Sequence, residues 1–398
     1  MILTANRAAL LAAAKKAAAI AAKSGEGALA CALVESESCD GLRLTAANGE
    51  SAIRLELQAE AGETGRALAN AARLASAISL TGGERVRLSA GGRGATLAIE
   101  PADRGPMQRA TLRRLPSEQF PPVELEAQDG SETVFVQGLA GLAKKVAFLA
   151  QGTGGDRAGA AGCIRARRGG GTLCVEASNS VALMMAKCRD ANTKGFDALL
   201  PARGMAALMA AMDGDAFVMA VGESRIVFRQ KGLIFTTGRP AAACLPDCAA
   251  IIQGNAPACC ATLEAGELAA ALRNLSAHGL AAPILPRVRI RLGEGEIRLA
   301  VEETEKYKGS GEVTVAADTT GQMRPQGFLY DIGMLARPLQ GTQGKAKVQF
   351  SDRGLLSLRR TEECYMQAPL RDAAPERSAQ GAENESAESN GGHEAKAA

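Results

Sequence analysis

The chain has no tryptophan, few other aromatic residues and only two histidines among its 398 residues. Because aromatic residues make up 3% of the sequence, Ala, Leu, Val and Met must fill the hydrophobic cores, and each of them buries a modest apolar area. His278 and His393 leave almost no material for a Ser-His-Asp triad or a histidine-bound metal. The composition therefore gives little support to an enzyme of either kind.

The sequence also lacks long apolar runs and the spacing of a metal-binding cysteine motif. No stretch of about 18 apolar residues occurs, so no membrane-spanning helix is expected. The opening MILTANRAALLAAAKK places its basic residues mainly after the apolar stretch, unlike a secretory signal. The ten cysteines are therefore predicted to be reduced and buried in a cytoplasmic protein. Cys244, Cys248, Cys259 and Cys260 contain no C-x-x-C pair, so neither zinc nor another cofactor is predicted.

What the chain does contain is a long internal repeat. The pairs Lys15-Lys16, Lys144-Lys145 and Arg273-Asn274 follow one another at steps of 129 residues. Each pair lies in a helix-like segment: LLAAAKKAAAIAA (10–22), LAGLAKKVAFLAQ (139–151) and LAAALRNLSAHG (268–279). A fixed long period indicates one unit used three times. A cationic helix repeated three times favours a scaffold that faces a polyanion over a hydrolase or a small-molecule-binding α+β protein.

The three units share an order of predicted elements. Each opens with a short strand that leads into the basic helix, continues with strands of alternating polarity, and closes with hairpins around glycine-containing turns. A second helix is predicted in each unit, over Arg66–Leu80, Ala202–Met212 and Phe328–Ala336. Two helices and about eight short strands per unit predict an α+β fold with antiparallel sheets on one side of the helices.

Polar segments that contain glycine or proline set the predicted domain boundaries. The first domain is predicted over residues 1–124, the second over 131–252 and the third over 258–371. Residues 372–398 lack periodicity and large apolar side chains, and are predicted to be a disordered acidic tail. Residues 373–398 hold five Glu against one Arg and one Lys, a net charge of −3, which leaves +6 on the body.

Four short segments, in order, resemble those of one known family. Leu115-Pro-Ser-Glu-Gln-Phe-Pro121 is similar to an LPxxxFP segment that closes the family's first domain, and Leu200-Pro-Ala-Arg-Gly204 is similar to its VPRKG. Ile234–Thr237 followed by Leu245-Pro-Asp247 resembles FTS…FPDY, and Cys364–Arg371 resembles the terminal YVVMPMRL. The family is the bacterial sliding clamp, the beta subunit of DNA polymerase III, and the resemblance spans about residues 1–371.

The resemblance implies a non-enzymatic ring. Two chains form a head-to-tail homodimer of six similar domains, helices line the hole, and duplex DNA passes through without base contacts. Diffuse attraction to phosphates holds DNA without stopping it from sliding. The residues expected to face DNA are Lys15, Lys16, Lys23, Arg66, Arg73, Lys144, Lys145, Arg203 and Arg273. The alternative for any single one is an ordinary solvated helix face.

The resemblance also implies a groove between the second and third domains, where DNA polymerase III and the clamp loader insert short peptides. Carried over by position, the groove comprises Ser178, Ser180, Val181, Leu183, Pro246, Ile251, Met366, Pro369 and Leu370. The family's TDGHRL is replaced here by Ser178-Asn-Ser-Val-Ala-Leu183. A shallower, less polar groove with altered or weaker affinity for peptides is therefore expected.

The implied dimer interface departs from the family as well. A large aromatic residue of the family aligns with Ala110, while Leu112 is kept and Leu275 is its expected partner. Losing a ring of that size costs about 3 kcal/mol if nothing refills the gap. The alternative reading is a clamp-like paralogue with altered or lost partner binding or dimerisation. The acidic tail is hypothesised to compete with partners or with DNA.

Overall fold

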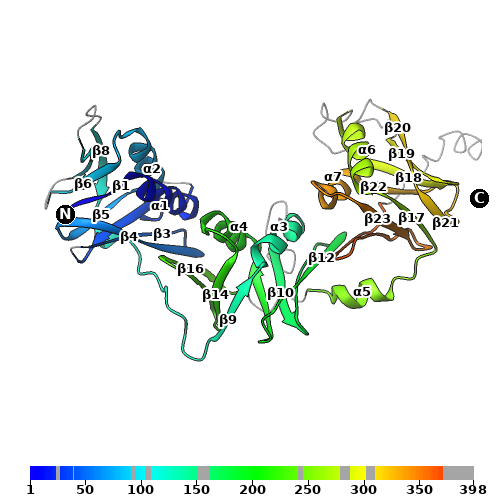
Figure 1. Cartoon of the computed structure of the whole chain (residues 1–398), viewed down its shortest axis with the longest axis horizontal. Helices are drawn as coiled ribbons and strands as arrows, with labels where there is room; N and C mark the ends of the chain where they lie inside the picture. Colours follow the sequence, from blue (N-terminus) through cyan, green and yellow to red (C-terminus); the bar gives the residue numbers. More distant parts are fainter. Residues whose placement is uncertain are drawn as a thin grey trace, which may run out of the picture.

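The computed structural model describes residues 1–23, 27–38, 40–91, 95–103, 109–150, 162–240, 245–277, 287–301 and 310–370. Predictions that involve Cys244, His278 or the tail from residue 372 fall outside these ranges. The described chain forms an open arc of three lobes, with the N-terminus in the first lobe and the last described strands in the third (Figure 1). Helices gather toward the hollow of the arc, and strands form much of its outer side.

The described residues of the first lobe, called unit one, form eight strands and two α-helices. Asn6 begins the first helix, because its side-chain oxygen accepts a hydrogen bond from the Ala9 backbone N–H at 3.1 Å. The elements are β1 (Ile2–Asn6), α1 (Arg7–Ile20), η1 (Ala28–Ala30), β2 (Cys31–Ser36), β3 (Gly41–Ala47), β4 (Ser51–Glu63), β5 (Gly65–Asn70), α2 (Ala71–Leu80), β6 (Arg85–Ser89), β7 (Thr96–Pro101) and β8 (Ala110–Leu115).

Unit two repeats this order. A linker containing η2 (Ser117–Gln119) leads into it from unit one. Its elements are β9 (Glu132–Gln137), α3 (Leu139–Ala150), β10 (Cys163–Gly169), β11 (Thr172–Ser178), β12 (Ala182–Arg189), β13 (Phe196–Pro201), α4 (Ala202–Ala211), β14 (Ala216–Val221), β15 (Arg225–Gln230) and β16 (Leu233–Gly238).

Unit three follows a second linker, which contains the short helix α5 (Cys248–Gly254). Its elements are β17 (Cys259–Glu264), α6 (Ala265–Ala277), β18 (Arg287–Gly293), β19 (Glu296–Val301), β20 (Gly311–Ala316), β21 (Asp318–Gly321), β22 (Phe328–Asp331), α7 (Ile332–Ala336), η4 (Arg337–Leu339), β23 (Lys345–Phe350), β24 (Leu356–Arg359) and β25 (Glu363–Gln367). The three units therefore share the predicted order of strand, basic helix, strands, second helix and hairpins.

Two sheets run across the junctions between units. A 12-stranded sheet joins units one and two through β4 and β16, and a nine-stranded sheet joins units two and three through β12 and β25. Both of these pairings are antiparallel. A third sheet of four strands, in the order β20-β19-β18-β22, belongs to unit three alone. The last strand of one unit thus pairs with the fourth strand of the unit before it.

Two of the second helices are shorter than predicted. The segment Arg66–Leu80 begins as strand β5, and only Ala71–Leu80 is helical. Likewise, Phe328–Asp331 is strand β22, and the helix begins at Ile332. Asn70 and Asp331 begin the two helices, because their side chains accept hydrogen bonds from the N–H groups of Arg73 and Met334, each at 3.0 Å. The residues before each helix pair into a sheet instead, because their apolar side chains fit a buried strand as well as they fit a helix.

The linkers between units cross the outer sheet faces. In the first linker, Phe120 packs on a cluster that contains Leu33 and Leu68, and Leu125 packs with Ala47 and Ala52 near the junction. In the second linker, Cys248 and Ile252 of α5 pack on the outer side of β12 and β25, in a cluster with Leu183, Cys364 and Met366. A domain boundary at residue 252 would cut α5, which runs on to Gly254.

Candidate nucleic-acid and partner interfaces

The two lysine pairs lie on α1 and α3, and the second lysine of each pair reaches across a junction between units. Lys16 of unit one forms an ion pair at 2.5 Å with Asp213 of unit two, and Lys145 of unit two forms one at 2.5 Å with Glu363 of unit three. Both lysines are therefore already neutralised by a neighbouring unit. The sequence pattern could not show this, because the acidic partners are 197 and 218 residues away.

A second group of predicted cations is exposed on the helices. None of its members forms an ion pair with another described residue. Two belong to the lysine pairs, one occupies the matching position on α6, and two lie on the second helices. They are Lys15, Lys144, Arg273, Arg73 and Arg203. Lys23, which follows the end of α1, is also exposed.

Arg66 is a correction to the predicted DNA-facing set. It lies on strand β5, and it pairs with Glu35 at 2.9 Å and Glu37 at 3.5 Å. Alternation along the strand places Arg66 on the same face as Leu68, which packs against the first linker on the outer side of the sheet. The face of β5 that meets the helices carries Ala67 and Ala69 instead. Arg66 thus points away from the helix layer.

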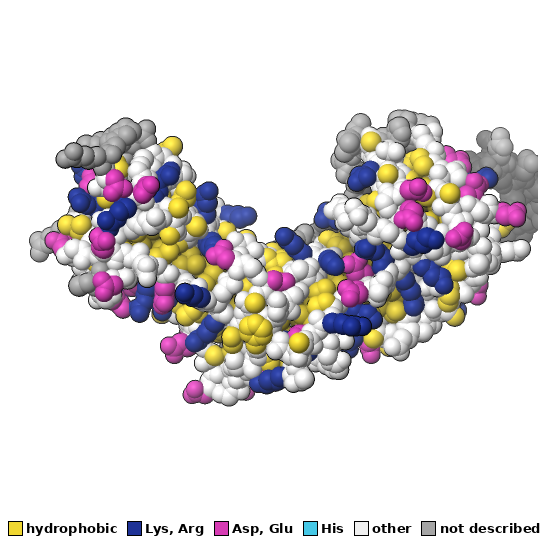
Figure 2. Space-filling model, in the orientation of Figure 1, with side chains coloured by type: hydrophobic (Ala, Val, Ile, Leu, Met, Phe, Trp, Pro, Cys, Tyr) yellow, Lys and Arg dark blue, Asp and Glu magenta, His cyan; other side chains and the backbone are white. Residues whose placement is uncertain are grey.

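Basic side chains occur on the hollow side of the arc. Figure 2 shows dark-blue Lys and Arg side chains at intervals along the concave edge, and more of them across the visible face. The concave edge belongs to the helix-bearing side of all three units (Figure 1). The exposed cations of α1, α3 and α6 recur once per unit, so their charge is spread along the arc rather than concentrated in one pocket.

The structure brings the residues of the predicted groove together around the junction of β12 and β25. Leu183 and Met366 lie opposite each other in the strand register, and they are only 6% and 1% exposed. The Val181 carbonyl accepts a hydrogen bond from the Ala368 N–H at 2.8 Å. Ser178 is buried, Val181, Pro369 and Leu370 are half-buried, and Ser180, Pro246 and Ile251 are exposed. Because α5 covers the apolar walls, Ile251 is the large apolar side chain of the set that remains open, at 38% exposure.

Beside α5 lies a charged cluster that the sequence pattern did not predict. Glu176 on β11 is 1% exposed, and Arg165 and Arg167 on β10 approach its carboxylate at 3.7 and 3.5 Å. Burial raises the pKa of Glu176 despite these two guanidinium groups. Burial, together with Glu176 and Asp247, raises the pKa of the Cys248 thiol to about 12, so Cys248 stays protonated. Strand alternation, which places Arg165, Arg167 and Glu176 on one face of the sheet, was the available signal.

The two ends of the arc present sheet edges. Strand β20 ends the four-stranded sheet. Strand β8 pairs with β7 over its first four residues and with β5 only at Arg114 and Leu115, so among the described strands the start of β8 has a partner on one side. Ala110 and Leu112 on β8 are half-buried and remain available to a partner. Leu275 is only 1% exposed and lies in the core of its own unit. It is therefore not free to pack against Leu112 of a second chain, contrary to the expectation from sequence.

No family model and no curated protein sequence matches this chain. Solved structures do match it closely in shape. The beta subunit of the DNA polymerase of Streptococcus pyogenes has a TM-score of 0.79 at 15% identity, and the DNA polymerase III subunit beta of Pseudomonas aeruginosa has 0.79 at 19%. The DNA polymerase sliding clamp of Caulobacter crescentus has 0.79 at 22% identity. Each comparison covers 94% of this chain and 100% of the other.

The chain has the sliding-clamp fold. The resemblance predicted from four short segments is thus confirmed at the level of the α+β fold. Identities of 12–22% across the similar structures show how far the sequence has diverged on this shared clamp framework.

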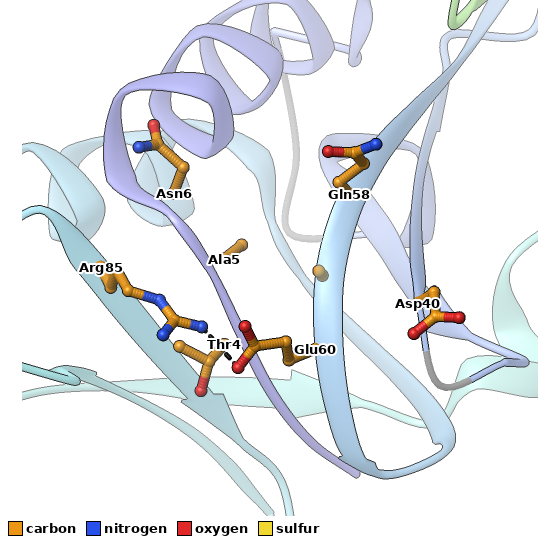
Figure 3. Close-up of a pocket in the computed structure, with 8 residues that line it drawn as sticks. Thr4, Ala5, Asn6, Asp40, Gln58, Glu60 and Arg85 are labelled. Carbon is orange, nitrogen blue, oxygen red and sulfur yellow. Dashed lines mark ion pairs between the residues drawn. The ribbon is translucent and has the colours of Figure 1, made fainter.

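Elsewhere on the clamp fold, a surface hollow of about 350 Å³ lies between β1, β4 and β6 of unit one. Figure 3 shows its polar lining, in which Arg85 and Glu60 form an ion pair at 2.6 Å. Asn6 is occupied with capping α1. Within the ranges that the structure describes, no three or more His, Cys, Asp or Glu side chains gather in a way that would hold a metal. Among the same residues, no helix is long and apolar enough to cross a membrane.

Proposed function

We propose that this chain is a DNA sliding clamp, a non-enzymatic processivity factor that acts in the cytoplasm. Two copies close head to tail into a ring around duplex DNA, and the ring tethers a replicative polymerase and other partners. The observation that carries the proposal is the recurrence of Lys15, Lys144 and Arg273 as exposed cations on α1, α3 and α6, the first helix of each unit. These helices lie toward the hollow of the clamp-fold arc (Figure 1).

The charge pattern suits sliding. Duplex DNA carries one phosphate charge per ~1.7 Å of axis, so evenly spaced cations attract it at every position along the helix. Contacts to phosphates carry no sequence information, and no single position along the duplex is favoured. Arg73 and Arg203 on the second helices add to the same field. Lys16 and Lys145 contribute less, because acidic partners neutralise them.

The repeat within the chain supports closure by a second copy. At both internal junctions the last strand of one unit pairs with the fourth strand of the unit before it, as β16 with β4 and β25 with β12. The matching strands left at the two ends are β8, the last of unit one, and β20, the fourth of unit three. Pairing β8 of one chain with β20 of another would extend the same rule and cover the open edge of β20.

The groove for partner peptides is proposed at the second junction, around Val181, Pro246 and Ile251. Its exposed apolar area is small, because α5 packs over Leu183 and Met366. This observation favours a second candidate, a clamp-like paralogue that has the ring but binds the usual peptide motif weakly or not at all. Titrating a peptide from a polymerase clamp-binding motif decides between the two.

Retention on DNA tests the proposed ring. A closed ring threaded on circular duplex DNA stays bound through gel filtration in high salt, and is lost when the circle is cut once. Sedimentation should give about twice the chain's 40.9 kDa. Equal retention on circular and linear DNA would reject encirclement, while a monomer at all concentrations would reject the homodimer.

A further inference from the structure

The open strands at the two ends of the arc carry charges of opposite sign. Strand β8 lies at the end formed by unit one, and β20 lies at the end formed by unit three (Figure 1). Arg109 directly precedes β8, and Glu312 is the second residue of β20. Both side chains are exposed. A head-to-tail contact between two chains would therefore bring a cation and an anion to the same pair of strands.

The strand registers identify the counterparts of Arg109 inside the chain. In each unit, the third-last residue of the first strand leads across three further strand pairings to one residue. That residue is Ile234 in unit two and Cys364 in unit three. In unit one it is Arg109, where the last step is the ion pair between the Arg109 and Glu100 side chains at 3.9 Å.

The same procedure identifies the counterpart of Glu312. The third-last residue of the strand before each second helix leads across three pairings to Arg54 in unit one, Met185 in unit two and Glu312 in unit three. Arg54 and Met185 are the residues that lie opposite the counterparts of Arg109 at the two internal junctions. Pairing β8 with β20 by this rule places Arg109 of one chain opposite Glu312 of the other.

Both side chains are able to form a new ion pair. Arg109 is 63% exposed, and its distance of 3.9 Å from Glu100 is longer than a hydrogen bond, so its guanidinium group has donors left for a second carboxylate. Glu312 forms no ion pair with any residue that the structure describes. Arg298, on the strand beside β20, pairs with Glu296 instead.

We infer that Arg109 of one chain pairs with Glu312 of the other at each contact between two chains, and that this pair selects the head-to-tail arrangement. The pair rests on the proposed ring, whose two contacts would each contain it once. Arg87 lies opposite Glu100 in the strand register, so the charges would alternate in sign across four neighbouring strands, as cross-strand pairs prefer. Joining two like ends would instead bring charges of one sign together.

Charge reversal in the full chain tests the pair. Arg109→Glu alone or Glu312→Arg alone places like charges at both contacts of a homodimer, and each should weaken dimerisation roughly tenfold. Mixing the two single variants should restore dimerisation, because one contact of the mixed dimer then has the original pair and the other has the reversed pair. Sedimentation over a range of concentrations measures the association, and native mass spectrometry identifies the mixed dimer.

Two further sets of variants serve as controls. Arg229→Glu makes the same change of charge at an exposed position on β15, away from both ends, and should leave dimerisation unchanged. Arg109→Gln and Glu312→Gln remove the attraction without adding repulsion. They should weaken dimerisation roughly threefold and make it less sensitive to salt, so the pair can be tested even if a reversed variant does not fold.

The results separate this pair from the ring itself. Equal association of Arg109→Glu and Arg229→Glu, or no recovery when the two reversed variants are mixed, would overturn the inference. If the unaltered chains dimerise and are retained on circular DNA while all variants behave like the control, the proposed ring stands without this pair. If the unaltered chains stay monomeric at every concentration, the ring is rejected and the pair with it.

Discussion

The junctions inside the chain and the edges at its two ends are built from the same strands but with different side chains. Phe235 on β16 and Tyr365 on β25 are 0% and 1% exposed, and they lie opposite Ile53 of β4 and Met184 of β12. Tyr365 also packs on Phe148 of α3 in the neighbouring unit, with ring centroids 6.3 Å apart. Each internal junction therefore buries one large ring between two units.

The matching positions at the ends hold small residues. Counted through the strand registers, Ala110 on β8 corresponds to Phe235 and Tyr365, and Gly311 on β20 corresponds to Ile53 and Met184. Asn274 on α6 takes the place of the bridging Lys16 and Lys145. An edge with these residues offers backbone hydrogen bonds but little apolar area. Because the end strands lack the large rings of the internal junctions, we expect the contact between two chains to be weaker than either internal junction.

The largest effect is expected from removing a ring inside the chain. Tyr365→Ala should lower the free energy of unfolding by about 3–5 kcal/mol, because it leaves a cavity between Phe148, Met184 and the sheet. Tyr365→Phe is the matched control, and it should cost about 1 kcal/mol through the lost hydrogen bond to Gln367. Urea unfolding measures both. Equal losses for the two variants would show that the ring itself does not hold the junction.

The next effect tests the edge at the end of the arc. Ala110→Phe should restore a ring at the proposed β8–β20 contact and tighten association of two chains roughly tenfold, or about 1.4 kcal/mol. Thr111→Phe places the same ring on the next residue, which faces the other side of the strand, and should not strengthen association. Sedimentation over a range of concentrations compares the two. If Thr111→Phe tightens association as much, the register carried over from the internal junctions is wrong.

The fold of the three units was only partly predictable from the sequence. The period of 129 residues and the alternating strands predicted three units and the helices α1, α3, α4 and α6. The start of α2 was placed too early, because the apolar residues of β5 fit either period, although Asn70 was the available cap signal. Helix α5 was not predicted, although Asp247 accepts a hydrogen bond from the Ala250 N–H at 3.0 Å in the same way.

The candidate site was harder to predict than the fold. Sequence spacing identified Lys15, Lys144 and Arg273, because each lies at the same place in one of the three repeated helix-like segments. It could not separate them from Lys16 and Lys145, because the acids that pair with these two lysines, Asp213 and Glu363, belong to other units. Leu275 is buried, and α5 covers Leu183. Both features depend on tertiary packing, which the periodicity of the sequence does not show.

Removing the exposed cation of each unit should weaken DNA binding in a salt-dependent way. In a variant with Lys15→Gln, Lys144→Gln and Arg273→Gln, the slope of log K against log salt should fall by about 0.9 for each lost phosphate contact. Affinity at low salt should fall roughly tenfold, with little change in thermal stability, since these side chains are exposed. Fluorescence anisotropy with labelled duplex DNA measures the slope. An unchanged slope would place these cations off the DNA path.

The smallest effect is expected at the bridging lysines. Lys16→Met should cost about 0.2–1 kcal/mol of stability, because Asp213 is 85% exposed and water screens the ion pair. A double-mutant cycle with Asp213→Asn isolates this coupling, which salt should weaken further. The salt slope of DNA binding should hardly change, since Lys16 is already neutralised. If Lys16→Met flattened that slope as much as Lys15→Gln does, both lysines of the pair would contact DNA, and the division between junction-bridging and DNA-facing cations would fail.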